Sequence, residues 1–345
     1  MPPSPFWIQT EDWHTAGEPF RIVEKLPEAF LPASSTVAQR RRDIIANSQH
    51  PLDQLRQSLC HEPRGHADMY GGFVTPPDDS GAAFGVLFWH KDGFSTACGH
   101  GTIALGYWAV ANGLVKTPES GEANVDVVID VPSGRVVASM RVIDGKPISA
   151  DFINVASYQF SKSIPVTIPS RGIEVCVDLA FSGAVYATID AEQLGLMVEP
   201  RNVDEFIKLG REIKASLGER AHHGSYDCYG IIFFNEEGDG AETVRQRNVT
   251  VFADGQIDRS PCGSGTCARQ AILYAQGRLG PDKCKLAHRS IIASEFEANI
   301  VSEAKSPIEG FPACIPKVKG EARLCGRMSF YIDPAEPIFP GFLLR

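Results

Sequence analysis

One phrase occurs twice in this chain, and the repeat limits what the chain can fold into. Residues 97–115 read ACGHGTIALGYWAVANGLV, and residues 261–279 read PCGSGTCARQAILYAQGRL. Aligned without gaps at an offset of 164, the two stretches share Cys98 with Cys262, Gly101 with Gly265 and five further identities. The offset is close to half of the 345 residues. The repeat therefore predicts an ancient duplication of a half-length domain, and the chain length also exceeds what one core usually serves.

Charge and composition exclude some classes of partner. The net charge is −9 at pH 7, and the only notable basic run is Arg40–Arg42, so we expect no nucleic-acid or anionic-membrane binding. The start, MPPSPFWIQTEDW, lacks the pattern of a secretory signal, which favours a cytoplasmic location. Residues 93–115 carry no charged side chain, but their glycines and polar residues fit a buried core helix better than a membrane span.

The nine cysteines form no CxxC pair and no close ligand pairs of the kind that bind zinc. Without a secretory signal, reduced thiols are expected. The ordinary interpretation of any one of them is a small buried hydrophobic residue.

Alternating patterns predict strands, and these outnumber the helices. Strands are expected over residues 125–131, 135–142, 148–155, 173–179, 184–189, 229–234 and 243–252, with a helix over residues 203–217. The strands follow one another as meanders, which favours α+β domains over a parallel sheet with a helix after each strand.

Each copy of the repeated phrase places one thiol at the start of a helix. A Gly-rich turn runs into an apolar segment, 102–111 or 266–275, that ends near Gly113 or Gly277. A helix N-terminus offers unpaired N–H groups and a positive dipole end, which bind an anion and lower the pKa of a thiol. Such a turn alone could be a phosphate cradle or a packing turn, and the pair could be a disulfide or two unrelated packing cysteines.

Two opposed thiols suit one reaction in particular. If the two turns face one ligand, their N–H groups can hold a small carboxylate with its α-carbon between the sulfurs. One thiolate then removes the α-hydrogen and the other thiol delivers a proton to the opposite face, which inverts the centre. Preorganised N–H donors stabilise the carbanion without a cofactor. The sequence contains no GxGxxG or GxxxxGK nucleotide motif.

Two polar residues break the symmetry of the repeat. His100 corresponds to Ser264 in the second copy, and Asp258 corresponds to Phe94 in the first. Since a substrate amine is not shared equally by the two halves, His100 and Asp258 are candidates to bind it. The alternative is structural: His100 caps its own helix, and Asp258 closes a turn.

Four motifs together resemble the proline racemase family, which includes hydroxyproline 2-epimerases and trans-3-hydroxy-L-proline dehydratases. They are DWHTAGEPFRIV from Asp12, EPRGHADMYGG from Glu62, ACGHGTIALG from Ala97 and ADGQIDRSPCGSGTCAR from Ala253. The resemblance implies an α+β, diaminopimelate epimerase-like fold of two pseudo-symmetric domains. Each would curl a β-sheet around a central helix, with the site between the domains and the last strand returning to the first. We therefore expect domains at 1–145 plus 328–345 and at 146–327.

The resemblance also assigns roles. It implies that Cys98 and Cys262 are the acid and base pair, and that the N–H groups of Gly99, His100, Gly263 and Ser264 bind the substrate carboxylate. His100 and Asp258 would contact the ring nitrogen. An imino acid substrate, no cofactor, no metal and a homodimer are expected.

The subfamily depends on the second cysteine. The motif sequences are similar to those of the dehydratases. In that group one of the two cysteines is typically replaced by Thr or Ser, whereas both are present here. Inversion needs two thiols and dehydration needs one base, so we expect a racemase or epimerase, with the dehydratase as the runner-up. A non-catalytic imino-acid binding protein and a thiol redox protein are the alternatives from other classes.

Overall fold

The computed structural model describes residues 4–240 and 242–344, which form two compact units. Unit 1 comprises the described residues of Met1–Thr15, Pro19–Ala150 and Glu321–Arg345, and unit 2 comprises Ala16–Glu18 and Asp151–Gly320. This division rests on contacts within each unit, and it does not test which segments fold independently. The domain bounds expected from the sequence, after residues 145 and 327, therefore stay a prediction.

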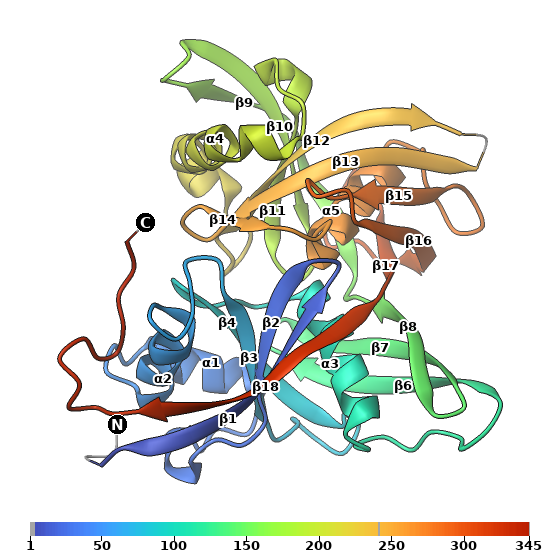
Figure 1. Ribbon diagram of the computed structural model, residues 1–345. Coiled ribbons are helices and arrows are strands. Elements are labelled where there is room, and N and C mark those ends of the chain that lie inside the picture. Colours follow the sequence, from blue (N-terminus) through green and yellow to red (C-terminus); the bar gives the residue numbers. More distant parts are fainter. Residues whose placement is uncertain (1–3, 241, 345) are drawn as a thin grey trace. The chain divides into compact units, whose positions relative to one another are not determined.

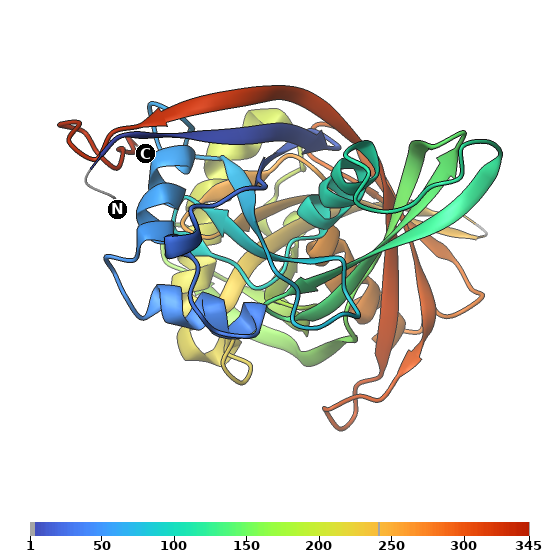
Figure 2. The ribbon, with the colours of Figure 1, turned by 90° about the horizontal axis from the view of Figure 1, so that it is seen from below.

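Unit 1 is a mixed sheet with three α-helices. Its strands are β1 (Phe6–Thr15), β2 (Glu18–Val23), β3 (Tyr70–Thr75), β4 (Phe84–His90), β5 (Gly93–Phe94), β6 (Glu122–Val131), β7 (Gly134–Ile143), β8 (Lys146–Ile153) and β18 (Ala322–Ile332). The helices are the 3₁₀ turn η1 (Glu28–Phe30), α1 (Val37–Ile45), α2 (Pro51–Cys60) and α3 (Gly99–Ala111). Figure 2 shows β1 and β18, from opposite ends of the chain, side by side as an antiparallel pair.

Unit 2 is a sheet that closes on itself. Its strands are β9 (Ser157–Ile168), β10 (Ile173–Phe181), β11 (Val185–Asp190), β12 (Cys228–Asp239), β13 (Thr243–Phe252), β14 (Gln256–Asp258), β15 (Lys285–Arg289), β16 (Glu295–Ala304) and β17 (Ala313–Gly320). The pairings run β9, β10, β11, β12, β13, β15, β16, β17 and back to β9. The helices are η2 (Ala191–Leu194), η3 (Pro200–Asn202), α4 (Val203–Leu217), η4 (Gly218–Ala221) and α5 (Gly263–Ala275).

The two units share one order of elements, which supports the duplication inferred from the repeat. In unit 1, β2 and β3 are parallel and joined through α1 and α2, whereas β4 and β6 are parallel and joined through α3. In unit 2, β11 and β12 are joined in the same way through α4, and β13 and β15 through α5. The expected meanders are present among the antiparallel neighbours, whereas these four pairs are parallel, and parallel strands need a long crossover.

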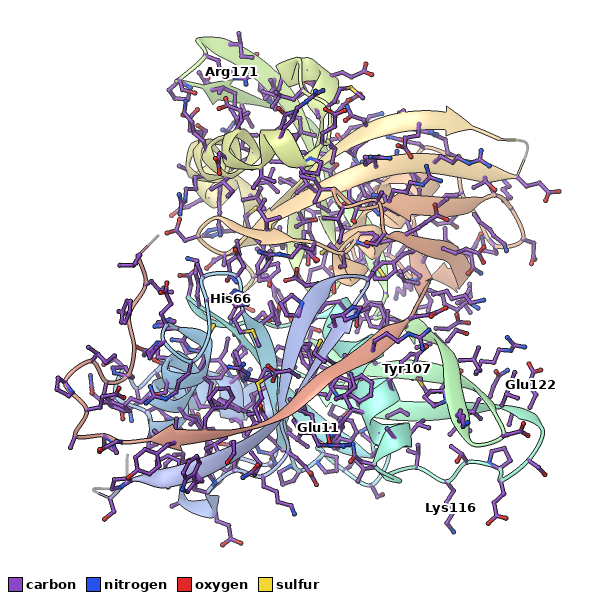
Figure 3. The ribbon with its side chains drawn as sticks, in the orientation of Figure 1. Glu11, His66, Tyr107, Lys116, Glu122 and Arg171 are labelled. Carbon is purple, nitrogen blue, oxygen red and sulfur yellow. The ribbon has the colours of Figure 1, made fainter. Side chains whose placement is uncertain are left out.

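A helix of 13 residues runs through each unit, α3 in the first and α5 in the second. Residues 99–110 of α3 and 263–273 of α5 are buried. Figure 1 shows α5 among the strands of unit 2, where it packs on β9 and β17. In unit 1, the Tyr107 hydroxyl donates to the carbonyl of Ile148, 2.8 Å away, which fastens α3 to β8 (Figure 3). Among the described residues, no helix is long and apolar enough to cross a membrane.

The strongest periodic patterns predicted their elements well. The helix over residues 203–217 and the strand over residues 243–252 have the predicted bounds. Both central helices begin three residues earlier than expected, at Gly99 and Gly263, because the Gly-rich turns themselves form the first turn of each helix.

Candidate active site

The first half of the candidate site is the turn that begins α3 in unit 1. Cys98 is the N-cap, and its sulfur accepts a hydrogen bond from the amide of Gly101 at 3.2 Å. A Cβ atom on Gly101 would lie 2.8 Å from that sulfur, so only glycine fits there. The Thr102 hydroxyl donates to the carbonyl of Cys98 at 2.8 Å, which fixes the turn from the other side. The Cys98 side chain is almost fully buried.

His100 lies against this thiol. Its ring nitrogens are 3.5 and 3.6 Å from Sγ of Cys98, and its ring makes edge contacts with the rings of Phe20 and Tyr70. Burial lowers the pKa of His100 to about 3, while a hydrogen bond to the carbonyl of Pro19 opposes that shift. The imidazole is therefore neutral at ordinary pH. The alternative that His100 caps its own helix is wrong, because the cap is the Cys98 sulfur.

The second half of the site, in unit 2, repeats this geometry at the start of α5. Cys262 is the N-cap, and its sulfur accepts the amide of Gly265 at 3.3 Å. A Cβ atom on Gly265 would lie 2.9 Å from the sulfur, which again requires glycine. The Cys262 side chain is buried as well. Unlike Cys98, Cys262 has a positive φ of 64°, which is unusual for a residue with a side chain.

Asp258 and Ser260 shape the turn that leads to Cys262. One carboxylate oxygen of Asp258 accepts both the amide and the hydroxyl of Ser260, at 2.8 and 2.7 Å. The Ser260 hydroxyl oxygen in turn accepts the amide of Cys262 at 3.0 Å. The expected structural role of Asp258 in closing the turn is thus present. Burial raises the pKa of Asp258 to about 6, and the hydrogen bonds from Ser260 limit that rise.

The pKa of Cys262 corrects one expectation. The position at a helix N-terminus was expected to lower it, but burial raises it well above the ordinary thiol value, and the nearby charge of Asp258 adds to the rise. Interactions with the Gly265 amide and with the side chains of Thr250 and Tyr186 oppose the shift without cancelling it. Desolvation of the thiolate outweighs the donors, so Cys262 is protonated in the free protein.

Both turns hold N–H groups that have no hydrogen-bond partner among the described residues. Among the bonds of the described residues, none is donated by the backbone N–H of Gly99, His100, Gly263 or Ser264. The buried hydroxyl of Ser264 also has no partner in that part of the chain. Unpaired N–H groups at a helix N-terminus are a ready site for a carboxylate.

The structure thus brings Cys98, Gly99 and His100 together in unit 1, and Asp258, Cys262, Gly263 and Ser264 together in unit 2. It adds two residues that the sequence reasoning missed. Ser260 links Asp258 to Cys262, and its place two residues after an aspartate was a signal for such a turn. Tyr186, whose hydroxyl oxygen is 3.9 Å from Sγ of Cys262, gave no signal because it lies on β11, far away in the sequence. Among the described residues, no group of three His, Cys, Asp or Glu side chains could hold a metal ion.

Comparison with known proteins gives full-length matches. A family model described as proline racemase matches residues 11–343. The chain is 38% identical over 342 residues to a trans-3-hydroxy-L-proline dehydratase of Bacillus cereus, covering 97% of each protein. It is 38% identical over 347 residues to a 3-hydroxyproline 2-epimerase of Burkholderia multivorans, covering 98% of each. A proline racemase of Clostridioides difficile is 34% identical over 347 residues, with 98% of each covered.

Comparison with solved structures identifies the fold. A hydroxyproline epimerase from Agrobacterium vitis, with bound trans-4-hydroxy-L-proline, matches with a TM-score of 0.87 and 28% identity, covering 98% of this chain and 96% of that one. A PhzF-family phenazine biosynthesis protein of Bacillus anthracis matches with a TM-score of 0.57 at 11% identity, covering 95% and 100%, which concerns the fold alone. The α+β, diaminopimelate epimerase-like fold expected from the sequence is confirmed.

Proposed function

Because the chain belongs to the proline racemase family, we propose that it is a cofactor-independent racemase or epimerase that inverts the α-carbon of proline or a hydroxyproline. Cys98 and Cys262 are the acid and base pair in this proposal. One observation carries it: each sulfur caps a buried helix and accepts the amide of the glycine three residues further on. Dehydration or binding alone gives no reason to keep two equivalent thiols.

The proposal has the two turns bind one substrate. The unpartnered N–H groups of Gly99, His100, Gly263 and Ser264 hold its carboxylate, as helix N-termini commonly do. The ring nitrogen, protonated in the free imino acid, carries a positive charge. Asp258 pairs with that charge, and the neutral imidazole of His100 accepts an N–H from the same nitrogen. Both groups are available in these forms at neutral pH, given the pKa values of about 6 for Asp258 and about 3 for His100.

The proton balance of the step is closed within the site. One sulfur, as thiolate, takes the α-hydrogen as a proton, and the electron pair of the C–H bond passes into the bound carboxylate. The opposite sulfur, as thiol, gives its proton to the other face of the α-carbon. The raised pKa of Cys262 supports the thiol form, and therefore the acid role, for this residue when the substrate enters. After one turnover the two sulfurs have exchanged their protonation states.

Dehydration of trans-3-hydroxy-L-proline is the second candidate. The Bacillus cereus protein with that name is as similar to this chain as the named epimerase is. In this reaction a single base takes the α-hydrogen and the 3-hydroxyl group leaves as water, so Cys262 would not transfer a proton.

A cytoplasmic location and a homodimer also remain part of the proposal.

Incubation in deuterated water separates these functions. L-Proline, trans-4-hydroxy-L-proline and trans-3-hydroxy-L-proline are supplied in turn, and the products are analysed by chiral chromatography and mass spectrometry. A racemase or epimerase forms the inverted isomer with one deuterium on the α-carbon. A dehydratase consumes only the 3-hydroxy compound and forms no inverted isomer, which would overturn the proposal.

The same incubation tests the other classes. A binding protein incorporates no deuterium into any of the three compounds. A thiol redox protein would require a reversible disulfide, so inversion that continues unchanged in excess reductant counts against it.

A further inference from the structure

A buried carboxylate from the start of the chain reaches the turn that leads to Cys262. Glu18, the first residue of β2, is assigned to unit 2 and is fully buried. Its Oε2 atom accepts the backbone N–H of Arg259 at 2.8 Å and lies 3.7 Å from a guanidinium nitrogen of the same residue. These two residues are 241 positions apart in the sequence. This contact plays no part in the reaction proposed above.

The amide that Glu18 holds belongs to a turn in which each N–H is bound. Asp258 accepts the amide of Ser260, and Ser260 accepts the amide of Cys262, while Pro261 has no N–H. Those two acceptors belong to the turn and move with it. Glu18 is an acceptor from a distant segment, so its bond to Arg259 ties the turn to a separate part of the unit.

The turn needs such support because of the backbone of Cys262. A φ of 64° is strained at a residue with a side chain, and it persists only where the surroundings hold it in place. Arg259 lies only three residues before Cys262. A bond that fixes Arg259 therefore limits how far the turn can relax.

The segment that carries Glu18 is itself tightly seated. Gly17 has a φ of 97°, and a Cβ atom on it would lie 2.5 Å from Cδ1 of Ile292 and 3.8 Å from Cβ of Arg259. The tip between β1 and β2 thus contacts Arg259 through Glu18, and Gly17 beside it has no room for a side chain. The close packing at Gly17 limits the movement of the tip, so Glu18 is a fixed acceptor for the Arg259 amide.

We propose that Glu18 is a positioning residue that holds Cys262 in its left-handed backbone conformation through Arg259. Glu18 does not touch the reacting atoms. Only its effect on turnover rests on the proposed function, since the position of the thiol can be measured without any substrate.

The test compares the two thiols of one molecule. Iodoacetamide is added to the intact protein, and modification of the Cys98 and Cys262 peptides is followed over time by mass spectrometry. Glu18→Ala removes the acceptor, so the turn relaxes and Cys262 becomes exposed. We expect the rate at Cys262, relative to that at Cys98, to rise about tenfold, in line with the loss of a charge-assisted hydrogen bond. Turnover should fall by a similar factor at unchanged KM.

Two further variants show whether the effect is specific. Glu18→Gln keeps an oxygen that accepts the Arg259 amide. The ratio of the alkylation rate at Cys262 to that at Cys98 should therefore equal the ratio in the parent protein. Asp130→Asn is the matched control: Asp130 is a buried carboxylate of unit 1 that accepts the amide of Asp78 at 2.8 Å. It should lower stability without raising the ratio. Should Glu18→Ala fail to fold, Gly17→Ala lifts the same tip, and the ratio should rise in the same direction.

The outcomes distinguish the inference from the proposed function. An unchanged ratio in Glu18→Ala overturns the inference, as does an equal rise in Glu18→Gln or Asp130→Asn. A raised ratio with unchanged turnover supports the positioning role and contradicts the assignment of Cys262 as an acid and base.

Discussion

The hydroxyl oxygen of Tyr186 lies 3.9 Å from the sulfur of Cys262, inside unit 2. Tyr186 is fully buried, and burial, together with Cys262, raises the pKa of its hydroxyl well above the ordinary value. The phenol therefore keeps its proton at any pH at which the protein works. It can donate that proton in a hydrogen bond to the thiolate that forms on Cys262, which stabilises a charge that burial otherwise opposes.

Tyr186→Phe removes this donor and leaves the ring in place. We expect the pKa of Cys262 to rise further and turnover to fall about fivefold, since a long hydrogen bond to an ionised sulfur contributes roughly 1 kcal/mol. The measurement is the rate of Cys262 alkylation as a function of pH, which should shift to higher pH in the variant. Cys98 in the same molecule is the control. Identical pH profiles at Cys262 would show that the hydroxyl does not contact the thiolate.

Asp258→Asn should change how stability depends on pH. Burial raises the pKa of Asp258 to about 6 in the folded protein, above the value of 3.8 for an exposed carboxyl group. Between these values the folded protein retains a proton that the unfolded chain has lost, so the free energy of unfolding falls as pH rises through the window. In the variant the neutral amide does not titrate, so the free energy of unfolding does not fall in this pH window.

Urea unfolding of the parent and of Asp258→Asn at pH 4 and pH 7 measures the effect. The variant should gain on the order of 2 kcal/mol relative to the parent between the two pH values. Turnover should fall nonetheless, because the proposed partner of the substrate's ring nitrogen has lost its charge. Equal pH dependence in both proteins would contradict a raised pKa at this carboxyl group.

A planar ligand should bind better than the substrates. Pyrrole-2-carboxylate has a flat ring carbon next to the carboxylate, as in the proposed carbanion, whereas proline is tetrahedral there, and a site complementary to the transition state favours the former. We expect competitive inhibition and slower alkylation of both Cys98 and Cys262 when the ligand is bound. Protection of neither thiol, or weaker binding than that of proline, would count against the site.

The parts of the site that repeat in the sequence could be predicted from it. Cys98 and Cys262 were placed at helix starts because the same Gly-rich phrase precedes two apolar segments, and the structure has both at N-caps. The raised pKa of Cys262 could not be predicted in the same way. A Gly-rich turn indicates the donors around a thiol, but not how much of unit 2 covers that thiol, and here burial dominates.

In other parts of the fold the sequence carries a local signal for a helix, or no local signal at all. The helix α1 begins after Thr36, whose hydroxyl accepts the amide of Gln39, and this Thr-x-x-Gln spacing is typical of a helix start. Pro51 at the start of α2 is a second such signal. Together the two signals indicate the helices that join the parallel strands β2 and β3. Tyr186 and Glu18 meet the Cys262 turn only through the tertiary fold, and no local spacing predicts those contacts.

The decisive variant for the two-thiol reaction is Cys262→Ser. Serine keeps the size of the side chain, and without a β-branch it tolerates the φ of 64° better than threonine would. Its hydroxyl has a pKa far above that of a thiol, so it neither returns a proton as readily nor acts as the opposing base. Inversion should be lost, by a factor of about a thousand, since general acid–base groups contribute typically 10²–10⁴-fold.

Cys98 would remain able to remove the α-hydrogen from its own face. The variant should therefore still exchange that hydrogen with solvent deuterium for one enantiomer and not for the other, which proton NMR of each pure enantiomer measures directly. Cys98→Ser is the matched control, and it should leave exchange of the opposite enantiomer only. If the parent instead dehydrates trans-3-hydroxy-L-proline without inverting any proline, and Cys262→Ser leaves that rate untouched, then Cys262 transfers no proton. The dehydratase assignment would then replace the racemase, with Cys98 as its single base.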